Sequence, residues 1–188
     1  SELSLLKMQV NPHFLFNTLN NIYSLAMLKD DRAATAVLKL SELMRYQLEQ
    51  SNSEKVELDK EISFIKNYVE LQSIRLSEKA CIEFKCENSN PQALIAPLVL
   101  ITFIENAFKH GISTHANSKI KIELHAENTQ LQLKVNNQIF QNLQEEAPSG
   151  LGLENVKRRL QLAYPDKHQL EIKKHEGTFE VLLKINLV

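Results

Sequence analysis

The chain has 188 residues, of which 43% are hydrophobic and 24% are charged, so it can bury a sizeable core and is neither disordered nor fibrous. Its formal net charge of −1 gives no bulk attraction to nucleic acid or to anionic membranes, and no nucleic acid partner is expected. No apolar run reaches the roughly 18 residues that a membrane-spanning helix needs. Residue 1 is Ser rather than Met, and we therefore expect a piece of a longer protein.

Helical periodicity dominates the first 50 residues. Residues 3–28 and 32–50 each carry an apolar stripe, formed by Leu15, Leu19, Ile22 and Ala26 in the first and by Val37, Leu40, Met44 and Leu48 in the second. The short polar connection between them predicts a helical hairpin. Two such helices bury little by themselves, so we expect the hairpin to pair with a second copy into a four-helix bundle.

Two further helices are expected after the polar segment at residues 50–54. One begins near Asp59 as its N-cap, and its broad apolar arc indicates packing on two sides. The other is opened by Pro97, runs to about His110 and is closed by Gly111 as its C-cap.

Alternating apolar residues predict strands in the rest of the chain. They lie near residues 81–86, 120–124 and 131–135, and in a final hairpin around Glu176-Gly177. A polar loop at residues 138–150 precedes a predicted helix at residues 152–163. We therefore expect two domains, a helical hairpin at residues 1–52 and an α+β sandwich at residues 53–188.

The first of three motifs is Asn11-Pro12-His13-Phe14-Leu15-Phe16-Asn17. On a helix, His13, Asn17, Asn20 and Ser24 form a polar stripe roughly opposite the apolar one. Neutral imidazole has an unprotonated nitrogen, which is a competent nucleophile near neutral pH. A solvated surface histidine gives the same pattern and is the more frequent case for a lone histidine.

The second motif is Glu105-Asn106-Ala107-Phe108-Lys109-His110-Gly111, at the end of an apolar helix. Asn106 and His110 share one helix face, and Glu105 and Lys109 share the next. An amide oxygen suits Mg²⁺, and a lysine suits phosphate. A charged last turn that interacts with the helix dipole fits these residues equally well.

The third motif is Ser149-Gly150-Leu151-Gly152-Leu153, at the start of a helix. Glycines let the backbone approach a phosphate, and a helix N-terminus offers unpaired N–H groups. A simple helix-entry turn is the commoner meaning of a short G-x-G. The chain has only four glycines, however, and three of them lie in the second and third motifs, which favours phosphate binding.

Taken in this order, the three motifs resemble those of LytS-type sensor histidine kinases, and the resemblance covers nearly the whole chain. The first is similar to the phosphoacceptor box and the second to the N box. The third, continued by Glu154-Asn155-Val156-Lys157-Arg158-Arg159-Leu160, is similar to the G box. The resemblance implies a Bergerat-type ATP-binding sandwich with a mixed, mainly antiparallel sheet behind a dimerisation hairpin.

The same resemblance implies the roles of the residues. His13 would accept the γ-phosphoryl group of ATP and pass it to an aspartate in the receiver domain of a response regulator, while Asn17 would orient its ring and Glu105 would add polarity to the site. Mg²⁺ would be ligated by Asn106. Nucleotide contacts would come from Asn106, Lys109, His110, Asn137, Gly150, Leu151, Gly152 and Leu153, with residues 138–149 as a lid. The protein would be a homodimer and the cytoplasmic portion of a bacterial sensor, reaching the membrane only through a sensor segment outside this chain.

Two departures from the family pattern affect the expected chemistry. Asn137 stands where an adenine-binding aspartate is usual, which predicts a micromolar-to-millimolar Kd for ATP because a charge-assisted hydrogen bond is lost. Phe14 follows His13 where many histidine kinases have an acidic residue, so no adjacent base is evident. The first departure leaves an alternative function open, in which the protein is a degenerate kinase that acts as a dimeric scaffold or as a phosphatase of its regulator. Glu105 leaves a second alternative open, in which the protein is an ATP hydrolase.

Overall fold

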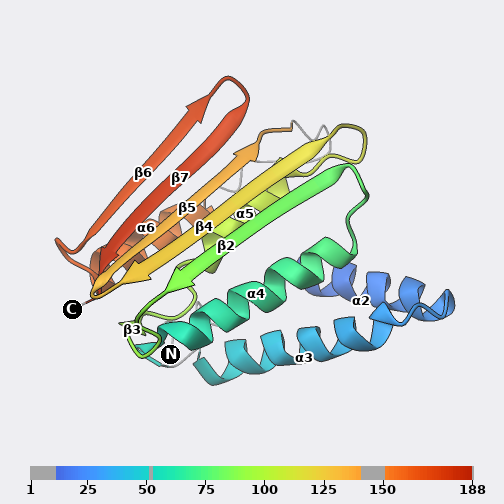
Figure 1. The fold of residues 1–188 in the computed structure, drawn as a ribbon, viewed down its shortest axis with the longest axis horizontal. Helices are drawn as coiled ribbons and strands as arrows, with labels where there is room; N and C mark the ends of the chain where they lie inside the picture. Colours follow the sequence, from blue (N-terminus) through green and yellow to red (C-terminus); the bar gives the residue numbers. More distant parts are fainter. Residues whose placement is uncertain (1–11, 51–52, 141–150, 188) are drawn as a thin grey trace.

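The computed structural model describes residues 12–50, 53–140 and 151–187. Its elements are α2 (Pro12–Met27), α3 (Arg32–Gln50), β1 (Val56–Glu57), α4 (Leu58–Ile74), β2 (Ala80–Asn88), β3 (Leu94–Ile95), α5 (Ile101–Gly111), β4 (Ser118–Glu127), β5 (Gln130–Gln138), α6 (Leu151–Ala163), β6 (His168–His175) and β7 (Thr178–Asn186). The predicted α+β class, with helices first and a sheet afterwards, is confirmed (Figure 1).

A five-stranded sheet organises the second half of the chain. Its strand order is β2-β4-β5-β7-β6, in which β2 and β4 run parallel and the other neighbours run antiparallel. Helices α5 and α6 lie on one face of this sheet (Figure 1). The sheet is therefore mixed and mainly antiparallel, as predicted.

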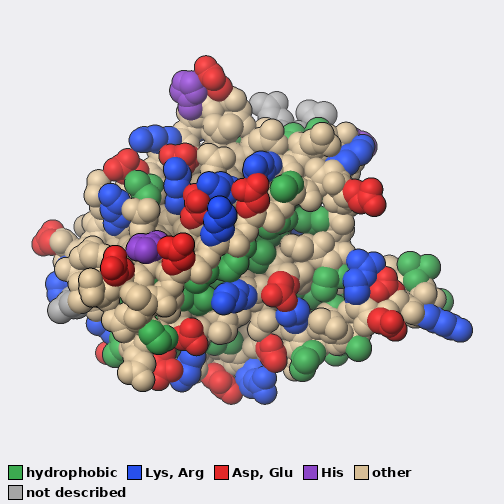
Figure 2. Space-filling view, viewed as in Figure 1, with side chains coloured by type: hydrophobic (Ala, Val, Ile, Leu, Met, Phe, Trp, Pro, Cys, Tyr) green, Lys and Arg blue, Asp and Glu red, His purple; other side chains and the backbone are tan. Residues whose placement is uncertain are grey.

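Side chains alternate between the two faces of the sheet, as the period-2 pattern requires. On β4, Ile120, Ile122 and Leu124 are buried under the helices. The opposite face carries charged side chains of both signs, including the ion pairs Lys119–Glu83 at 2.7 Å and Lys121–Glu123 at 2.9 Å. Figure 2 shows positively and negatively charged side chains interspersed over this face of the molecule. Helices therefore cover only the buried face of the sheet. A ligand pocket can form on that side, between the sheet and the helices.

Helix α4 lies between the hairpin and the sandwich (Figure 1). Toward the hairpin, the Tyr46 ring of α3 stacks on Phe64 of α4 with ring centroids 4.6 Å apart. Toward the sandwich, the rings of Tyr68 of α4 and Phe108 of α5 form a T-shaped pair with centroids 5.8 Å apart. The predicted packing of this helix on two sides is thus confirmed.

The predicted start of α4 near Asp59 is confirmed to within one residue, but the predicted caps of α4 and α5 and the predicted start of α5 are wrong. Helix α4 begins at Leu58 without a side-chain cap, and Asp59 lies inside its first turn, because Val56-Glu57 is extended to pair with β3. Helix α5 begins at Ile101 rather than at Pro97, because Leu98 takes a left-handed backbone conformation with φ +60° that interrupts the helix. Gly111 is the last residue of α5, and the C-cap is the extended Ile112.

The buried faces of α2 and α3 also differ from the predicted stripes. In α2, Leu15 and Ile22 pack on the core as expected. Leu19 is 46% exposed, however, and Ala26 is also exposed. The buried positions of this helix are Thr18 and Leu25 instead. In α3 the buried residues are Ala36, Leu40 and Leu43, and Val37 and Leu48 are exposed. Each hairpin helix has few packing neighbours and can bury only part of its circumference. The apolar residues cover a larger part of the circumference, so some of them remain exposed. The predicted helix from residue 3 also includes positions 3–11, which lie outside the described residues.

Within the described ranges, no helix combines the length and the apolar character needed to cross a membrane.

Candidate nucleotide and phosphotransfer site

The second motif forms the last two turns of α5, on the sheet face covered by helices. Glu105 and Asn106 are half-buried there, and Lys109 and His110 lie in the last turn. Removal from water raises the pKa of the Glu105 carboxyl to about 7. Asn106 Nδ2 is buried and has no hydrogen-bond partner in the described part of the chain. The Asn106 amide is therefore a buried polar group that the described part of the fold does not satisfy.

Gly111, at the end of this motif, lies directly against Asn137 of β5. A Cβ atom on Gly111 would come within 2.8 Å of Asn137 Cβ, closer than two carbon atoms can approach. Asn137 is 1% exposed, and its Nδ2 donates to the Gln138 carbonyl at 2.6 Å. Its Oδ1 is buried and accepts no hydrogen bond from any described residue. A buried acceptor without a donor is what a ligand amine could satisfy.

The third motif begins α6 beside α5. A Cβ atom on Gly152 would lie 3.9 Å from Thr102 Cγ2, which places this glycine next to the first turn of α5. Leu153 packs partly on the hydrophobic core. Gly150 and most of the predicted lid at residues 138–149 lie outside the described residues, and of Leu151 only the backbone is described. The structure thus places α5, which carries the N-box-like motif, next to the start of α6, which carries the G-box-like motif.

The first motif lies at the start of α2. Pro12 and His13 occupy its first turn, where only their backbone is described, and Asn17 follows one turn later, half-buried. The Phe14 ring packs on Tyr68 with centroids 5.2 Å apart, and Tyr68 in turn contacts Phe108 of α5. Two ring contacts therefore join the residue after His13 to the helix that carries the second motif.

Part of the predicted polar stripe of α2 is visible. Asn20 and Ser24 are exposed, and the Ser24 hydroxyl donates to the Asn20 carbonyl at 3.0 Å. The direction of the His13 side chain is outside what is described, so its place on this stripe stays a prediction.

A magnesium ion would have to be bound together with a nucleotide. Among the side chains that the structure describes, no group of three or more His, Cys, Asp or Glu residues could hold a metal ion. Mg²⁺ commonly takes one or two protein ligands and completes its shell with substrate phosphates and water. The half-buried carboxamide of Asn106 fits that pattern as a single oxygen donor.

Tyr68 is a residue of this site that the sequence analysis missed. It is buried, and its hydroxyl accepts a hydrogen bond from Gln72 Nε2 at 2.8 Å. Its pKa is raised, chiefly by burial and to a smaller extent by the negative charge of the nearby Glu105. The available signal was position: Glu61, Tyr68 and Gln72 interrupt the apolar arc of α4 at helical spacing. Polar residues inside a buried arc need partners, and that need marks them as candidates.

Arg159 of the third motif also has a defined contact. Its guanidinium donates to the Pro97 carbonyl at 2.7 Å, next to the start of α5. Arg159 therefore connects α6 to the segment before α5.

Comparisons with known proteins agree with this arrangement. A model of the histidine kinase family matches residues 1–80. The chain is 30% identical to the sensor protein LytS of Staphylococcus haemolyticus, over 94% of this chain and 32% of that protein. It is also 30% identical to the sensor protein kinase HptS of Staphylococcus aureus, over 94% of this chain and 37% of that protein. The chain thus spans about a third of the length of the curated relatives it matches.

The fold has solved counterparts as well. The histidine kinase domain of a blue-light activated kinase from Erythrobacter litoralis superposes with a TM-score of 0.51 at 10% identity, over 91% of this chain and 94% of that one. An identity this low supports the fold alone. The two staphylococcal relatives, each 30% identical over 94% of this chain, show that the chain belongs to the LytS-type sensor histidine kinases.

Proposed function

We propose that this chain is the kinase core of a two-component sensor, which transfers the γ-phosphoryl group of ATP to His13 and then to an aspartate of a response regulator. The observation that carries the proposal is the buried Oδ1 of Asn137, which accepts no hydrogen bond from any described residue and belongs to a side chain packed against Gly111 at the end of the N-box-like helix. The adenine amino group is a donor of the kind that Asn137 Oδ1 lacks.

The phosphates of ATP would lie toward α6. Gly152 leaves the N-terminus of α6 open beside Thr102, and a helix N-terminus with a glycine offers backbone N–H groups to an anion. Lys109 supplies a positive charge from the last turn of α5. Mg²⁺ held by Asn106 would neutralise charge on the phosphate oxygens.

The transfer itself needs alignment and charge neutralisation more than covalent help. An imidazole nitrogen of His13 forms a bond to the γ-phosphorus while the bond from that phosphorus to the bridging oxygen breaks and ADP leaves. The imidazole N–H proton passes to solvent. In the second step a carboxylate oxygen of the regulator takes the phosphoryl group, and His13 regains a proton.

A homodimer is part of this proposal. Apolar side chains remain exposed along one face of α2, namely Phe16, Leu19, Tyr23 and Met27. They follow one another at helical spacing, and a large exposed apolar patch on a helix favours association. A second hairpin on this face would complete a four-helix bundle.

The proposal is tested with ATP labelled in its γ-phosphate. With Mg²⁺, the protein should acquire label that is lost in acid and retained in base, as expected for phosphohistidine. His13→Ala should acquire none and should still bind a fluorescent ATP analogue. Label that persists in His13→Ala, or steady release of phosphate without any labelled protein, would overturn the proposal.

A further inference from the structure

Glu61 of α4 is a charged residue in the interior of the protein. It is 0% exposed, and its neighbours along the helix are apolar core residues such as Ile62 and Ile65. An ionised carboxyl is stable in such a place only if donors or cations surround it. Glu61 therefore marks a point where several elements must converge.

The first of these elements is the N-terminus of α5. The N-cap residue Leu100 provides no side-chain hydrogen bond for this helix. Burial raises the pKa of the Glu61 carboxyl, and hydrogen bonding from the backbone amides of Leu98 and Leu100 opposes this rise by favouring the ionised form. The Glu61 carboxyl therefore acts on the backbone that leads into α5, the helix that carries Glu105 and Asn106.

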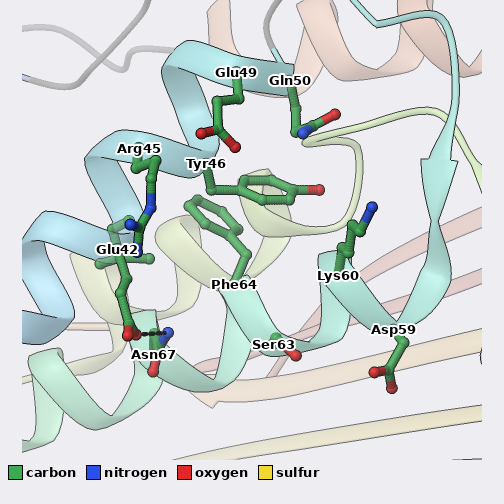
Figure 3. Close-up of a pocket in the computed structure, with 11 residues that line it drawn as sticks. Glu42, Arg45, Tyr46, Glu49, Gln50, Asp59, Lys60, Ser63, Phe64 and Asn67 are labelled. Atoms are coloured by element: carbon green, nitrogen blue, oxygen red, sulfur yellow. Dashed lines mark hydrogen bonds between the residues drawn. The ribbon is translucent and has the colours of Figure 1, made fainter.

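The second element is α3, the second helix of the hairpin. Tyr46 Oη donates to Glu61 Oε2 at 2.5 Å, and its ring stacks on Phe64. Figure 3 shows the two rings lying over one another, at a pocket of about 290 Å³ between α3 and α4. Glu61 Oε1 makes no well-formed hydrogen bond with any described residue, so Tyr46 is the principal side-chain donor to this carboxyl.

The third element is α6. The positive charge of the Arg159 guanidinium favours the ionised form of Glu61, and the same group donates a hydrogen bond to the Pro97 carbonyl. The Tyr164 hydroxyl accepts a hydrogen bond from the Ala96 amide at 2.7 Å. The segment at residues 96–100 is therefore held by α4 and by the G-box-like helix together. Its left-handed Leu98, an uncommon conformation for a non-glycine residue, is maintained by these contacts.

We propose that the hydrogen bond between Tyr46 and Glu61 is a positioning contact for phosphoryl transfer, which fixes the hairpin relative to the N-terminus of α5. Tyr46 and Glu61 are positioning residues, because they act through the placement of α5 and not on the nucleotide. The inference rests on the proposed function, since it concerns the step from ATP to His13.

Two contacts are needed to define both the position and the direction of the hairpin. The ring contact of Phe14 with Tyr68 holds the start of α2 on α4. Glu61 lies seven residues before Tyr68, which is about 10 Å along a helix at 1.5 Å per residue. The Tyr46–Glu61 contact therefore prevents the hairpin from pivoting about the Phe14–Tyr68 contact, and transfer rates depend steeply on such alignment.

The test separates alignment from binding and from stability. Tyr46→Phe keeps the ring stack on Phe64 and removes the hydroxyl, and Glu61→Gln keeps the side-chain size. Each should slow the formation of phosphohistidine at saturating ATP by about tenfold, with the Kd for an ATP analogue within about twofold of the wild type. The double variant should be no slower than the slower single one, because both remove one contact.

A matched control removes another buried hydroxyl of this cluster. Tyr164→Phe loses the contact with the Ala96 amide and leaves Tyr46–Glu61 in place. We expect it to lower stability about as much as Tyr46→Phe does, while the rate falls by less than twofold. Rates within twofold of the wild type in both Tyr46→Phe and Glu61→Gln, or effects that multiply in the double variant, would overturn the proposal.

A second measurement does not depend on kinase activity. Spin labels at the exposed positions Ser41 of α3 and Leu162 of α6, with Cys81 and Cys86 replaced by Ser, report the distance between hairpin and sandwich. Dilution with unlabelled chain suppresses distances between subunits. Tyr46→Phe should broaden the distance distribution, and an unchanged width overturns the positioning contact. If the wild type forms no phosphohistidine, the proposed function fails, while this measurement still decides the contact.

Discussion

Gly111 of α5 and Asn137 of β5 are packed without room for a single additional carbon atom. Gly111 has an ordinary helical backbone, so its glycine is required by this close approach and not by its conformation. The end of the N-box-like helix and β5, the strand that carries the proposed adenine contact, are thereby held in fixed positions relative to one another.

Gly111→Ala should therefore impair both folding and nucleotide binding. The new methyl group must push Asn137 aside, and overpacking of this kind costs about 1–3 kcal/mol of stability. Urea unfolding and titration with an ATP analogue measure the two effects. Gly152→Ala is the matched control for stability, because its Cβ has 3.9 Å of space and alanine favours a helix. Equal stability of the two variants would contradict the role assigned to Gly111.

Asn137→Ala should weaken ATP binding by about tenfold or more, since a hydrogen bond to the nucleotide is lost. Its effect on unfolding should be small, because the substitution also removes a buried acceptor that no described residue satisfies. Calorimetric titration and urea unfolding check the two expectations. Nanomolar binding of ATP by the wild type would contradict the weak affinity expected for Asn at this position.

Asn106→Ala should abolish magnesium-dependent labelling with the fold intact, because the oxygen proposed to hold Mg²⁺ is removed. Circular dichroism establishes the fold, and titration of Mg²⁺ at fixed ATP establishes the metal requirement. A variant that labels at the wild-type rate at low Mg²⁺ would exclude Asn106 as the ligand.

Stability should fall as the pH rises from about 4.5 to about 7 and then level off. Burial raises the pKa of both Glu61 and Glu105 from 4.5 to about 7, so the folded state binds more protons than the unfolded state in this interval. For the fully buried Glu61 the loss is up to about 3 kcal/mol. Urea unfolding across this range checks the slope, and Glu105→Gln should make it shallower. A slope that is the same in the variant contradicts the assignment to Glu105.

Phe16→Glu should convert the proposed dimer to monomers, because it places a charge on the exposed apolar face of α2, where Phe16 is 65% exposed. Light scattering at several concentrations measures the mass. Leu162→Glu on α6 is the control, since Leu162 is also exposed but lies on another element. A wild type that stays monomeric at high concentration speaks against pairing through this face.

Sequence periodicity predicted the strands of the sheet well. The predicted strands around 120–124 and 131–135 lie inside β4 and β5, and the turn at Glu176-Gly177 joins β6 to β7. Alternation is a direct consequence of one buried face, so it can be read from one strand alone. The two-residue strands β1 and β3 have no period to detect, and their pairing leaves Glu57 rather than Asp59 at the N-cap of α4.

The candidate site was predictable only where it is continuous in the sequence. The three motifs were identified because each is a short run of residues. The contact of Gly111 with Asn137, and the convergence of Tyr46 and Arg159 on Glu61, join residues far apart in the chain. No local pattern specifies which neighbour a buried polar residue will meet, although an acid inside an apolar arc indicates that such a neighbour exists.

The central place of α4 restricts how the hairpin can travel. One side of this helix stacks on α3 through Phe64, and the other meets α5 through Tyr68. Full detachment of the hairpin would expose the Phe64 ring and its apolar surroundings to water. This exposure costs a free energy of about 25 cal/mol for each Å² of apolar surface. Small rolling displacements that keep these rings covered are therefore the movements this architecture permits at low energy.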